Sequence, residues 1–294
     1  MFFTDDETLI LLIALAIRED LGTGDITSSL LPNPDAETTF KVTVKQPGVF
    51  SGKEIAQAIL NAYDPSITIE WYPSLQDGSI ISNVPAPVAT LQGSLSKILA
   101  AERVLLNFLQ HLSGIATLTR KFVDAVFGTS AKIFDTRKTT PGWRNLEKYA
   151  VRCGGGNNHR VGLYDGVLIK ENHISLGDEK RLGIRVFEML SQLENRKNKV
   201  GPIVVEARTL DHVEQLLSVI GIDVILLDNM SFVQLREAVE LRDGYGLRGK
   251  VELEASGGVT LNTVRVIAET GVDRISVGSI THSAPALDIS LERG

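Results

Sequence analysis

The sequence predicts an α/β protein, with an N-terminal α+β part followed by an irregular, incomplete barrel of βα units. From about residue 113, short apolar runs alternate with amphipathic helical patterns. The starts of successive runs lie roughly 20 to 36 residues apart, which is the spacing of βα units. Each run is followed at once by polar or charged residues, as expected where the strand ends of a barrel carry a functional site.

The first apolar stretch, residues 9–17, predicts a buried amphipathic helix that ends near Gly22. Acidic residues 5–7 precede it, where a secretory signal needs positive charge. The stretch is also shorter than the roughly 20 residues that span a bilayer. Thr4 or Asp5 is expected to cap this helix.

The composition is that of an ordinary globular protein, with 43% hydrophobic and 22% charged residues among 294. A net charge of −6 argues against a nucleic-acid-binding protein, which usually carries a basic face. An anionic ligand would therefore need a local cationic pocket. The single cysteine, Cys153, allows no intrachain disulfide and fits a reducing compartment. We expect a cytoplasmic protein without a membrane or nucleic-acid partner.

The first part of the chain mixes helical and strand patterns. Residues 40–45 alternate as in a half-buried strand, and apolar spacing predicts helices at about 51–63 and 94–112.

Six short apolar runs in the second part predict parallel strands. They are residues 132–134, 167–169, 203–205, 224–227, 251–253 and 274–277. One helical pattern runs from 211 to 220, with Ile220 on its apolar face and Thr209 as its N-cap, and another runs from 261 to 270. Because fewer than eight strands are evident, we expect an incomplete barrel.

The residues that follow these strands form the candidate site, since the carboxyl ends of parallel strands meet on one face. They are Asp135, Thr136, Arg137 and Lys138; Lys170, Glu171 and Asn172; Glu206; Asp228 and Asn229; residues 254–258; and Gly278 and Ser279. Six converging polar sets are hard to explain by structure alone, so we expect a functional site here.

Cations are frequent in this set. Arg137, Lys138, His159, Arg160 and Lys170 stand at strand ends or in the loop between two of them. In an acidic protein this favours a polyanion site over a solvated surface, because guanidinium groups match carboxylate and phosphate. Glu206 and Asp228 end neighbouring strands, and paired carboxylates beside phosphates commonly hold Mg²⁺. An internal ion pair with the lysines is the alternative.

Glycine turns follow the last two predicted strands. Residues 256–258 precede a helix and residues 278–279 close the final strand, and backbone N–H groups at such turns cradle phosphate. The loop 153–160 is also rich in glycine, and we expect either a mobile cover or a close backbone approach to ligand. The sequence has no CxxC, HExxH or GxSxG pattern, which disfavours soft-metal and serine-hydrolase chemistry.

Together these motifs resemble the quinolinate phosphoribosyltransferase family along nearly the whole chain. The matching stretches are residues 19–27, 102–114, 135–142, 154–160, 169–173, 226–229, 254–258 and 277–282. The resemblance implies an α/β open sandwich (residues 1–112 with 281–294) and a catalytic α/β barrel (residues 113–280), as in type II phosphoribosyltransferases. It also implies the conversion of quinolinate and phosphoribosyl pyrophosphate to nicotinate mononucleotide, pyrophosphate and CO₂ with Mg²⁺, a step of de novo NAD biosynthesis.

The resemblance further implies roles for single residues. Arg137, His159, Arg160 and Lys170 would hold the two quinolinate carboxylates, with Arg103 entering from a second subunit of a homodimer or hexamer. Lys138 and Lys170 would meet phosphoribosyl pyrophosphate, while Glu206 and Asp228 would position its Mg²⁺ and ribose hydroxyls. Thr136, Ser256, Gly257, Gly258, Gly278 and Ser279 would bind the phosphoribosyl group. The family often has Glu-x-Glu on the strand that ends at Glu206, whereas Val204 fills the first position here.

Three other interpretations remain open at this point. A Schiff-base aldolase could use Lys170 at a strand end, but it leaves the arginines unexplained. A related phosphoribosyltransferase-like protein, encoded beside molybdate transporters, shares many of the motifs. A non-enzymatic sensor with the same pocket would bind quinolinate without releasing pyrophosphate.

Overall fold

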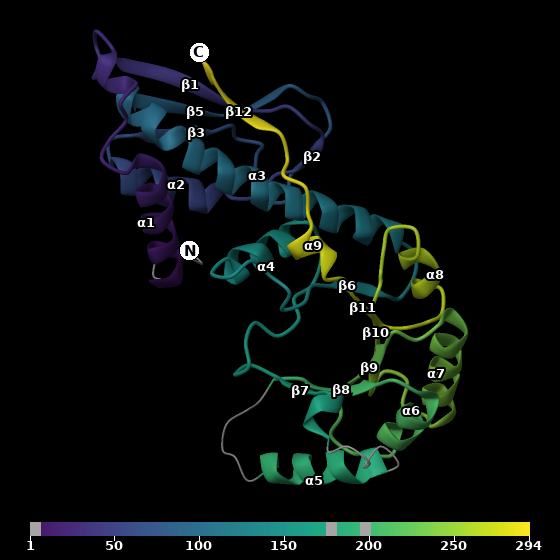
Figure 1. The fold of residues 1–294 in the computed structure, drawn as a ribbon. Helices are drawn as coiled ribbons and strands as arrows, with labels where there is room; N and C mark the ends of the chain where they lie inside the picture. Colours follow the sequence, from purple (N-terminus) through teal and green to yellow (C-terminus); the bar gives the residue numbers. More distant parts are fainter. Residues whose placement is uncertain (1–6, 175–180, 195–200) are drawn as a thin grey trace. The chain divides into compact units, whose positions relative to one another are not determined.

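The computed structural model describes residues 7–174, 181–194 and 201–294. The chain divides into two compact units (Figure 1). The first unit comprises residues up to Arg120, Thr139–Gly155 and Ile280–Gly294, and the second comprises Lys121–Lys138 and Gly156–Ser279. Within the described ranges, no helix combines the length and the apolar character needed to cross a membrane.

A four-stranded antiparallel sheet lies at the centre of the first unit. Its order is β12 (Ile289–Arg293), β1 (Glu37–Val44), β5 (Ala86–Ser94) and β3 (Thr68–Trp71). The predicted strand 40–45 falls within β1 except for its last residue, and its alternation buries Phe40, Val42 and Val44 while Lys41 is exposed. Because β12 pairs with β1, the C-terminal tail returns to the first unit, as the family resemblance implies.

Helices complete the first unit. They are α1 (Glu7–Leu21), α2 (Lys53–Tyr63), α3 (Leu95–Ala125), α4 (Arg144–Cys153) and α9 (Ser279–His282), with a 3-10 turn at Ser28–Leu30 and a small pair of strands, β2 (Gly48–Val49) and β4 (Ile80–Ile81). Residues 121–125 of α3 and the first residue of α9 belong to the second unit. Helix α1 ends at the predicted place, since Gly22 has a φ of 51°. The suggested caps Thr4 and Asp5 lie outside the described residues.

The predicted end of the third helix at residue 112 was wrong. Helix α3 continues to Ala125 and passes through Gly114. A Cβ added to Gly114 would lie 2.1 Å from the carbonyl oxygen of Pro285. This glycine therefore permits a close crossing of the C-terminal segment instead of ending the helix.

The second unit contains a six-stranded sheet in which every pair is parallel. Its order is β6 (Lys132–Phe134), β11 (Arg274–Ser276), β10 (Glu252–Ser256), β9 (Val224–Asp228), β8 (Ile203–Ala207) and β7 (Val167–Ile169). These are the six predicted strands. Since β6 and β7 lie at the two ends of the order, the described sheet is open, and the expected incomplete barrel is confirmed.

Helices follow the strands of this sheet. They are α5 (Leu182–Glu194), α6 (Leu210–Leu217), α7 (Phe232–Gly244) and α8 (Val264–Ala268), with a 3-10 turn at Glu171–His173. Helix α6 contacts β8, α7 contacts β10, and α8 contacts β11. The helices lie along one face of the sheet (Figure 1).

Two predicted helices are shorter in the structure. The Thr209 hydroxyl caps α6 by accepting a hydrogen bond from the backbone N–H of His212, as expected. The helix ends at Leu217, however, and Ile220 is 90% exposed, so its placement on the apolar face was wrong. Helix α8 spans only five of the ten residues expected.

Candidate active site

Parallel pairing brings the predicted strand-end residues to one edge of the sheet. The register sets Asp228 beside Ser256, and the N–H of Asn229 donates to the Ser256 carbonyl at 2.9 Å. All predicted site residues belong to the second unit except Arg103, which is exposed on α3 in the first. Thr136 accepts a hydrogen bond from the backbone of Lys138, which shapes the turn after β6.

Lys170 and Glu206 form an ion pair at the ends of adjacent strands. The Lys170 Nζ lies 3.2 Å from Glu206 Oε2. The Glu206 side chain is 7% exposed, whereas that of Lys170 is 48% exposed. The alternative of an ion pair with a lysine is therefore observed for Glu206. A pocket of about 170 Å³ adjoins this pair.

Arg208 completes this charge cluster and was missed in the sequence. Its guanidinium pairs with Glu171, and its Nε lies 3.8 Å from Glu206 Oε1 and 4.0 Å from Asp228 Oδ2. Arg208 is two residues after Glu206, so strand alternation alone would have placed it on the same face. Three carboxylates, those of Glu171, Glu206 and Asp228, thus surround one cationic group.

The donor set fits a divalent cation shared with a substrate. In the described ranges, no three His, Cys, Asp or Glu residues cluster in a way that would hold a metal by themselves. Two carboxylates that already share one cation are the kind of site in which Mg²⁺ completes its coordination with water and phosphate oxygens.

Arg137 and Arg160 lie close enough for their charges to interact. Burial lowers the pKa of Arg160, and the positive charge of Arg137 lowers it further, while Asp165 opposes both effects. The Arg160 Nη1 donates to the Gly166 carbonyl at 2.9 Å. Two partly desolvated guanidinium groups form an arrangement that an anion stabilises.

The glycine-rich loop is held along β6. The N–H of Asn157 donates to the Ile133 carbonyl at 2.8 Å, and the N–H of Asp135 donates to the Asn157 carbonyl at 3.0 Å. The buried Asp135 carboxylate accepts from the backbone N–H of His159 and the side-chain amide of Asn158. These contacts fix the position of the two residues that follow Asn158.

The glycine at position 154 in this loop is explained by packing. A Cβ added there would lie 2.4 Å from the carbonyl oxygen of Ala116 on α3. Neither ligand contact nor mobility is needed to account for it.

The turn after β10 has the backbone that only glycine adopts easily. Gly257 has a φ of +99° and Gly258 a φ of +59°. A Cβ added to Gly257 would lie 2.1 Å from Asn229 Oδ1, and Asn229 itself has a positive φ of 54°. After β11, Gly278 precedes Ser279, the first residue of α9. Such turns direct backbone N–H groups toward an anion.

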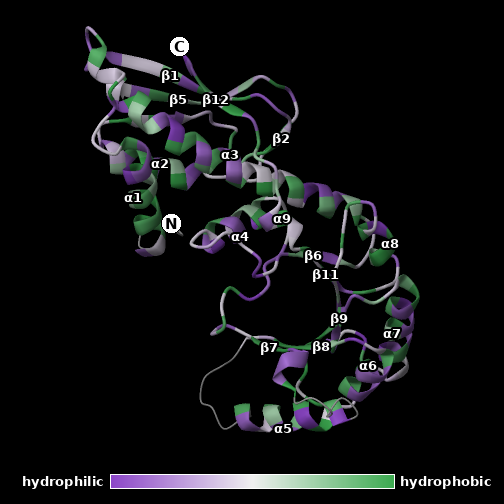
Figure 2. Ribbon diagram, viewed as in Figure 1, coloured by the Kyte–Doolittle hydropathy of each residue, from purple (hydrophilic) through white to green (hydrophobic). Residues whose placement is uncertain are grey.

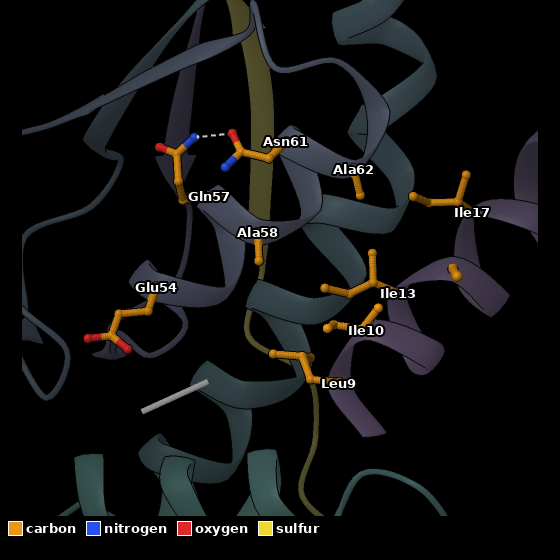
Figure 3. Close-up of a pocket in the computed structure, with 10 residues that line it drawn as sticks. Leu9, Ile10, Ile13, Ile17, Glu54, Gln57, Ala58, Asn61 and Ala62 are labelled. Carbon is orange, nitrogen blue, oxygen red and sulfur yellow. Dashed lines mark hydrogen bonds between the residues drawn. The ribbon is translucent and has the colours of Figure 1, made fainter. Parts of the chain in front are cut away.

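A roomier pocket, of about 740 Å³, lies in the first unit between α1 and α2 (Figure 3). Leu9, Ile10, Ile13 and Ile17 line it from α1, which is mostly hydrophobic (Figure 2). Glu54 is the one charged side chain among its lining residues, and Gln57 donates a hydrogen bond to Asn61 across its polar side. Because this pocket lacks cations, we place the anion site at the strand ends of the second unit.

Two models of one known protein family match this chain. The model of the quinolinate phosphoribosyl transferase N-terminal domain matches residues 25–113, and that of the C-terminal domain matches residues 115–292. The chain belongs to the quinolinate phosphoribosyltransferase family.

Relatives of this family match along most of their length. The chain is 41% identical over 293 residues to quinolinate phosphoribosyltransferase [decarboxylating] 2b, mitochondrial, of Nicotiana tabacum, with 95% of this chain and 80% of the relative covered. It is 38% identical over 275 residues to a probable nicotinate-nucleotide pyrophosphorylase [carboxylating] of Bacillus subtilis (strain 168), with 93% and 89% covered. The solved nicotinate-nucleotide pyrophosphorylase of Francisella tularensis superposes with a TM-score of 0.86 at 38% identity, over 98% of this chain and 96% of that one.

The structure explains why this member can lack the second acid of the Glu-x-Glu pattern. Val204 is buried and packs with Val224 and Leu226, and with the partly buried Leu168. These side chains form an apolar cluster across three neighbouring strands, and Val204 precedes Glu206 by two residues on β8. An unpaired carboxylate at position 204 would be desolvated there at a cost of several kcal/mol.

Proposed function

We propose that the chain is a decarboxylating quinolinate phosphoribosyltransferase of de novo NAD biosynthesis. It would join quinolinate to phosphoribosyl pyrophosphate and release nicotinate mononucleotide, pyrophosphate and CO₂. The observation that carries the proposal is the gathering of cationic and acidic strand-end residues on one edge of a parallel sheet, in a chain of this family.

In this proposal the paired arginines receive the dicarboxylate substrate. Quinolinate carries two carboxylates on adjacent ring carbons, and Arg137 and Arg160 supply two guanidinium groups whose mutual repulsion such a ligand would relieve. Lys170 and His159 would complete the site, together with Arg103 of a neighbouring subunit. The acidic net charge of the chain makes this local concentration of positive charge necessary.

Phosphoribosyl pyrophosphate would lie along the other strand ends. Lys138 and Lys170 would neutralise the diphosphate, since both are exposed to solvent here. The turns at residues 256–258 and 278–279, with Thr136, would hold the 5′-phosphate through backbone N–H and hydroxyl groups. Glu206 and Asp228 would hold the Mg²⁺ and the ribose hydroxyls. When bound, Mg²⁺ supplies positive charge that stabilises the departing pyrophosphate.

The proposed chemistry needs anion clamps and no protein nucleophile. The bond between ribose C1′ and the pyrophosphate oxygen breaks, its electron pair leaves with pyrophosphate, and the ring nitrogen forms the new bond to C1′. The nitrogen then carries positive charge. The bond from C2 to its carboxylate breaks, CO₂ leaves, and the electron pair left on C2 takes a proton. The cationic side chains are therefore assigned to stabilise the carboxylates of quinolinate and the negative charge on the departing pyrophosphate.

A direct assay tests the proposal. Purified protein with quinolinate, phosphoribosyl pyrophosphate and Mg²⁺ should form nicotinate mononucleotide, pyrophosphate and CO₂ in equal amounts. Lys170→Ala should lower kcat/KM at least about 100-fold, as expected for a group that stabilises developing charge. Lys250→Ala removes an exposed lysine elsewhere in the same unit and serves as the control. Absence of product with the unmutated protein rejects the proposal. The comparisons do not favour the molybdate-associated or aldolase alternatives.

We further propose that the protein forms a homodimer or hexamer in which Arg103 of one subunit reaches the active site of its neighbour. We also propose that the enzyme is cytoplasmic. Arg103 is exposed on α3 and has no role in its own unit's core. Arg103→Ala and Lys170→Ala proteins should each be weakly active, and mixing them should restore some activity if their subunits exchange. If mass spectrometry confirms that the subunits exchange but activity does not recover, the shared site is contradicted. Cell fractionation tests the cytoplasmic location.

A further inference from the structure

Glu254 is a buried carboxylate that the proposed reaction does not use. It lies on β10, is fully buried, and precedes the glycine turn by two residues. Burial raises the pKa of Glu254, while the charge of Arg274 opposes that rise. A buried acid is costly unless it is paired, so its contacts indicate what it stabilises.

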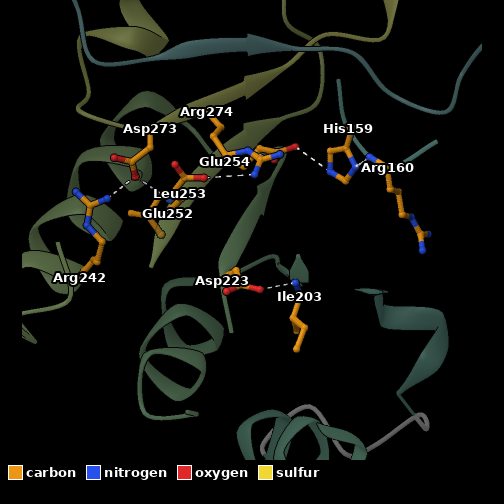
Figure 4. A network of polar contacts seen from close by, with 10 residues as sticks. All are labelled: His159, Arg160, Ile203, Asp223, Arg242, Glu252, Leu253, Glu254, Asp273 and Arg274. Atoms are coloured by element: carbon orange, nitrogen blue, oxygen red, sulfur yellow. Dashed lines mark hydrogen bonds and ion pairs between the residues drawn. The ribbon is translucent and has the colours of Figure 1, made fainter. Parts of the chain in front are cut away.

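One oxygen of Glu254 faces a cation that is fixed on several sides. The Arg274 Nε lies 2.8 Å from Glu254 Oε2 and forms an ion pair with it, but the geometry is not that of a hydrogen bond. The Arg274 guanidinium lies 3.8 Å from the centre of the Phe134 ring, and its Nη1 is 3.3 Å from Glu252 Oε2. Arg274 is therefore held in place without help from any substrate (Figure 4).

The other oxygen of Glu254 faces His159. The His159 Nε2 lies 3.5 Å from Glu254 Oε1, and the ring is 9% exposed. The backbone N–H of Arg160 donates to His159 Nδ1 at 2.9 Å. Since Nδ1 accepts, the neutral ring carries its proton on Nε2, directed at the carboxyl group of Glu254. At 3.5 Å the attraction is one of charge and dipole rather than a short hydrogen bond.

We propose that Glu254 is a positioning residue for quinolinate binding, acting through His159 on Arg160. The chain of contacts runs from Arg274 through Glu254 to the His159 ring, and from the ring to the backbone of Arg160 (Figure 4). Both ring nitrogens of His159 face protein groups, so Glu254 and the Arg160 backbone set the orientation of the ring. This inference rests on the proposed function, in which Arg160 holds a carboxylate of quinolinate.

Glu254→Gln tests the proposal, with Glu252→Gln as the matched control. Glu252 is on the same strand and contacts the same Arg274, but its side chain is half-exposed, whereas that of Glu254 is buried. Glu254→Gln should raise the KM for quinolinate about tenfold, the equivalent of roughly 1.4 kcal/mol. The KM for phosphoribosyl pyrophosphate should stay within about twofold of its original value, a change below roughly 0.5 kcal/mol. Glu252→Gln should leave both KM values unchanged.

A spectroscopic readout separates positioning from a purely structural role. The chain has five histidines, so the ¹⁵N ring signals of His159 can be assigned by comparison with a His159→Gln protein. The unmutated protein and Glu252→Gln should show the Nε2–H tautomer, and Glu254→Gln should show a mixture of tautomers. If Glu254→Gln does not fold, the same measurements are made on the Glu254→Gln/Arg274→Met protein, which leaves no buried cation unpaired.

An unchanged tautomer together with an unchanged KM for quinolinate would overturn the proposal. An equal rise in both KM values would do so too, because it would indicate general damage to the fold. The ring spectrum needs no substrate. A protein that makes no nicotinate mononucleotide would therefore refute the proposed function, while the tautomer would still report whether Glu254 orients His159.

Discussion

Replacing Gly257 or Gly258 by alanine should separate backbone strain from phosphate binding. Gly258 has a φ of +59°, and an added Cβ meets nothing within 4 Å, so Gly258→Ala should cost about 1 kcal/mol for the left-handed backbone alone. Gly257 has a φ of +99°, outside that region, and its Cβ would lie 2.1 Å from Asn229 Oδ1. Strain plus displacement of Asn229 should cost about 3 kcal/mol.

Two measurements on these variants check the reasoning. Urea unfolding gives the free energies of unfolding, which should fall by about 2 kcal/mol more in Gly257→Ala than in Gly258→Ala. Steady-state kinetics should show a higher KM for phosphoribosyl pyrophosphate in both variants, because the turn's N–H groups are the proposed phosphate ligands. Equal stability of the two variants would refute the strain argument. An unchanged KM in Gly258→Ala, despite a folded protein, would remove the turn from the phosphate site.

Other expectations concern three separate parts of the chain. Arg208→Gln should let the free protein bind Mn²⁺ about tenfold more tightly by EPR titration, because the guanidinium no longer shares Glu206 and Asp228; unchanged affinity would contradict this. The raised pKa of Glu254 means that the folded state holds this proton to higher pH than the unfolded state, so ionisation costs stability as pH rises above about 4.5. The difference in unfolding free energy, Glu254→Gln minus the unmutated protein, should therefore increase with pH. A difference that stays constant with pH would contradict the claim that ionisation of Glu254 destabilises the folded state. Burial raises the pKa of the Cys153 thiol, so iodoacetamide should label it slowly at pH 7.5 and quickly after unfolding; fast labelling of the folded protein would show that the thiol is accessible.

The strands of the second unit were predictable because their cues are local. Each apolar run was bounded by polar residues, and parallel pairing then required the strand ends to meet. The predicted cation and acid residues could be assigned to the same edge for this reason alone.

The errors arose where distant residues decide the local structure. Gly114 has the appearance of a helix end, yet it lies inside α3 because Pro285 packs against it. Ile220 continues an apolar spacing, but the chain has already left the helix at Leu217. Arg208 follows the end of β8, and its pairing with Glu171 depends on how two neighbouring strand ends meet. The roles of such residues depend on long-range packing, which a single sequence does not display.

The strand pairing of β12 with β1 has a consequence for biosynthesis. The sheet of the first unit joins residues 37–44 to residues 289–293, so its edge stays open until residues 289–293 have been translated. Most of the second unit comes from the continuous stretch Gly156–Ser279, which leaves the ribosome earlier. Because domains fold as their residues emerge, the N-terminal unit should be the last to reach its native state. Until then β1 offers an unpaired edge to other nascent chains, which makes this half the place where chaperone assistance would matter most.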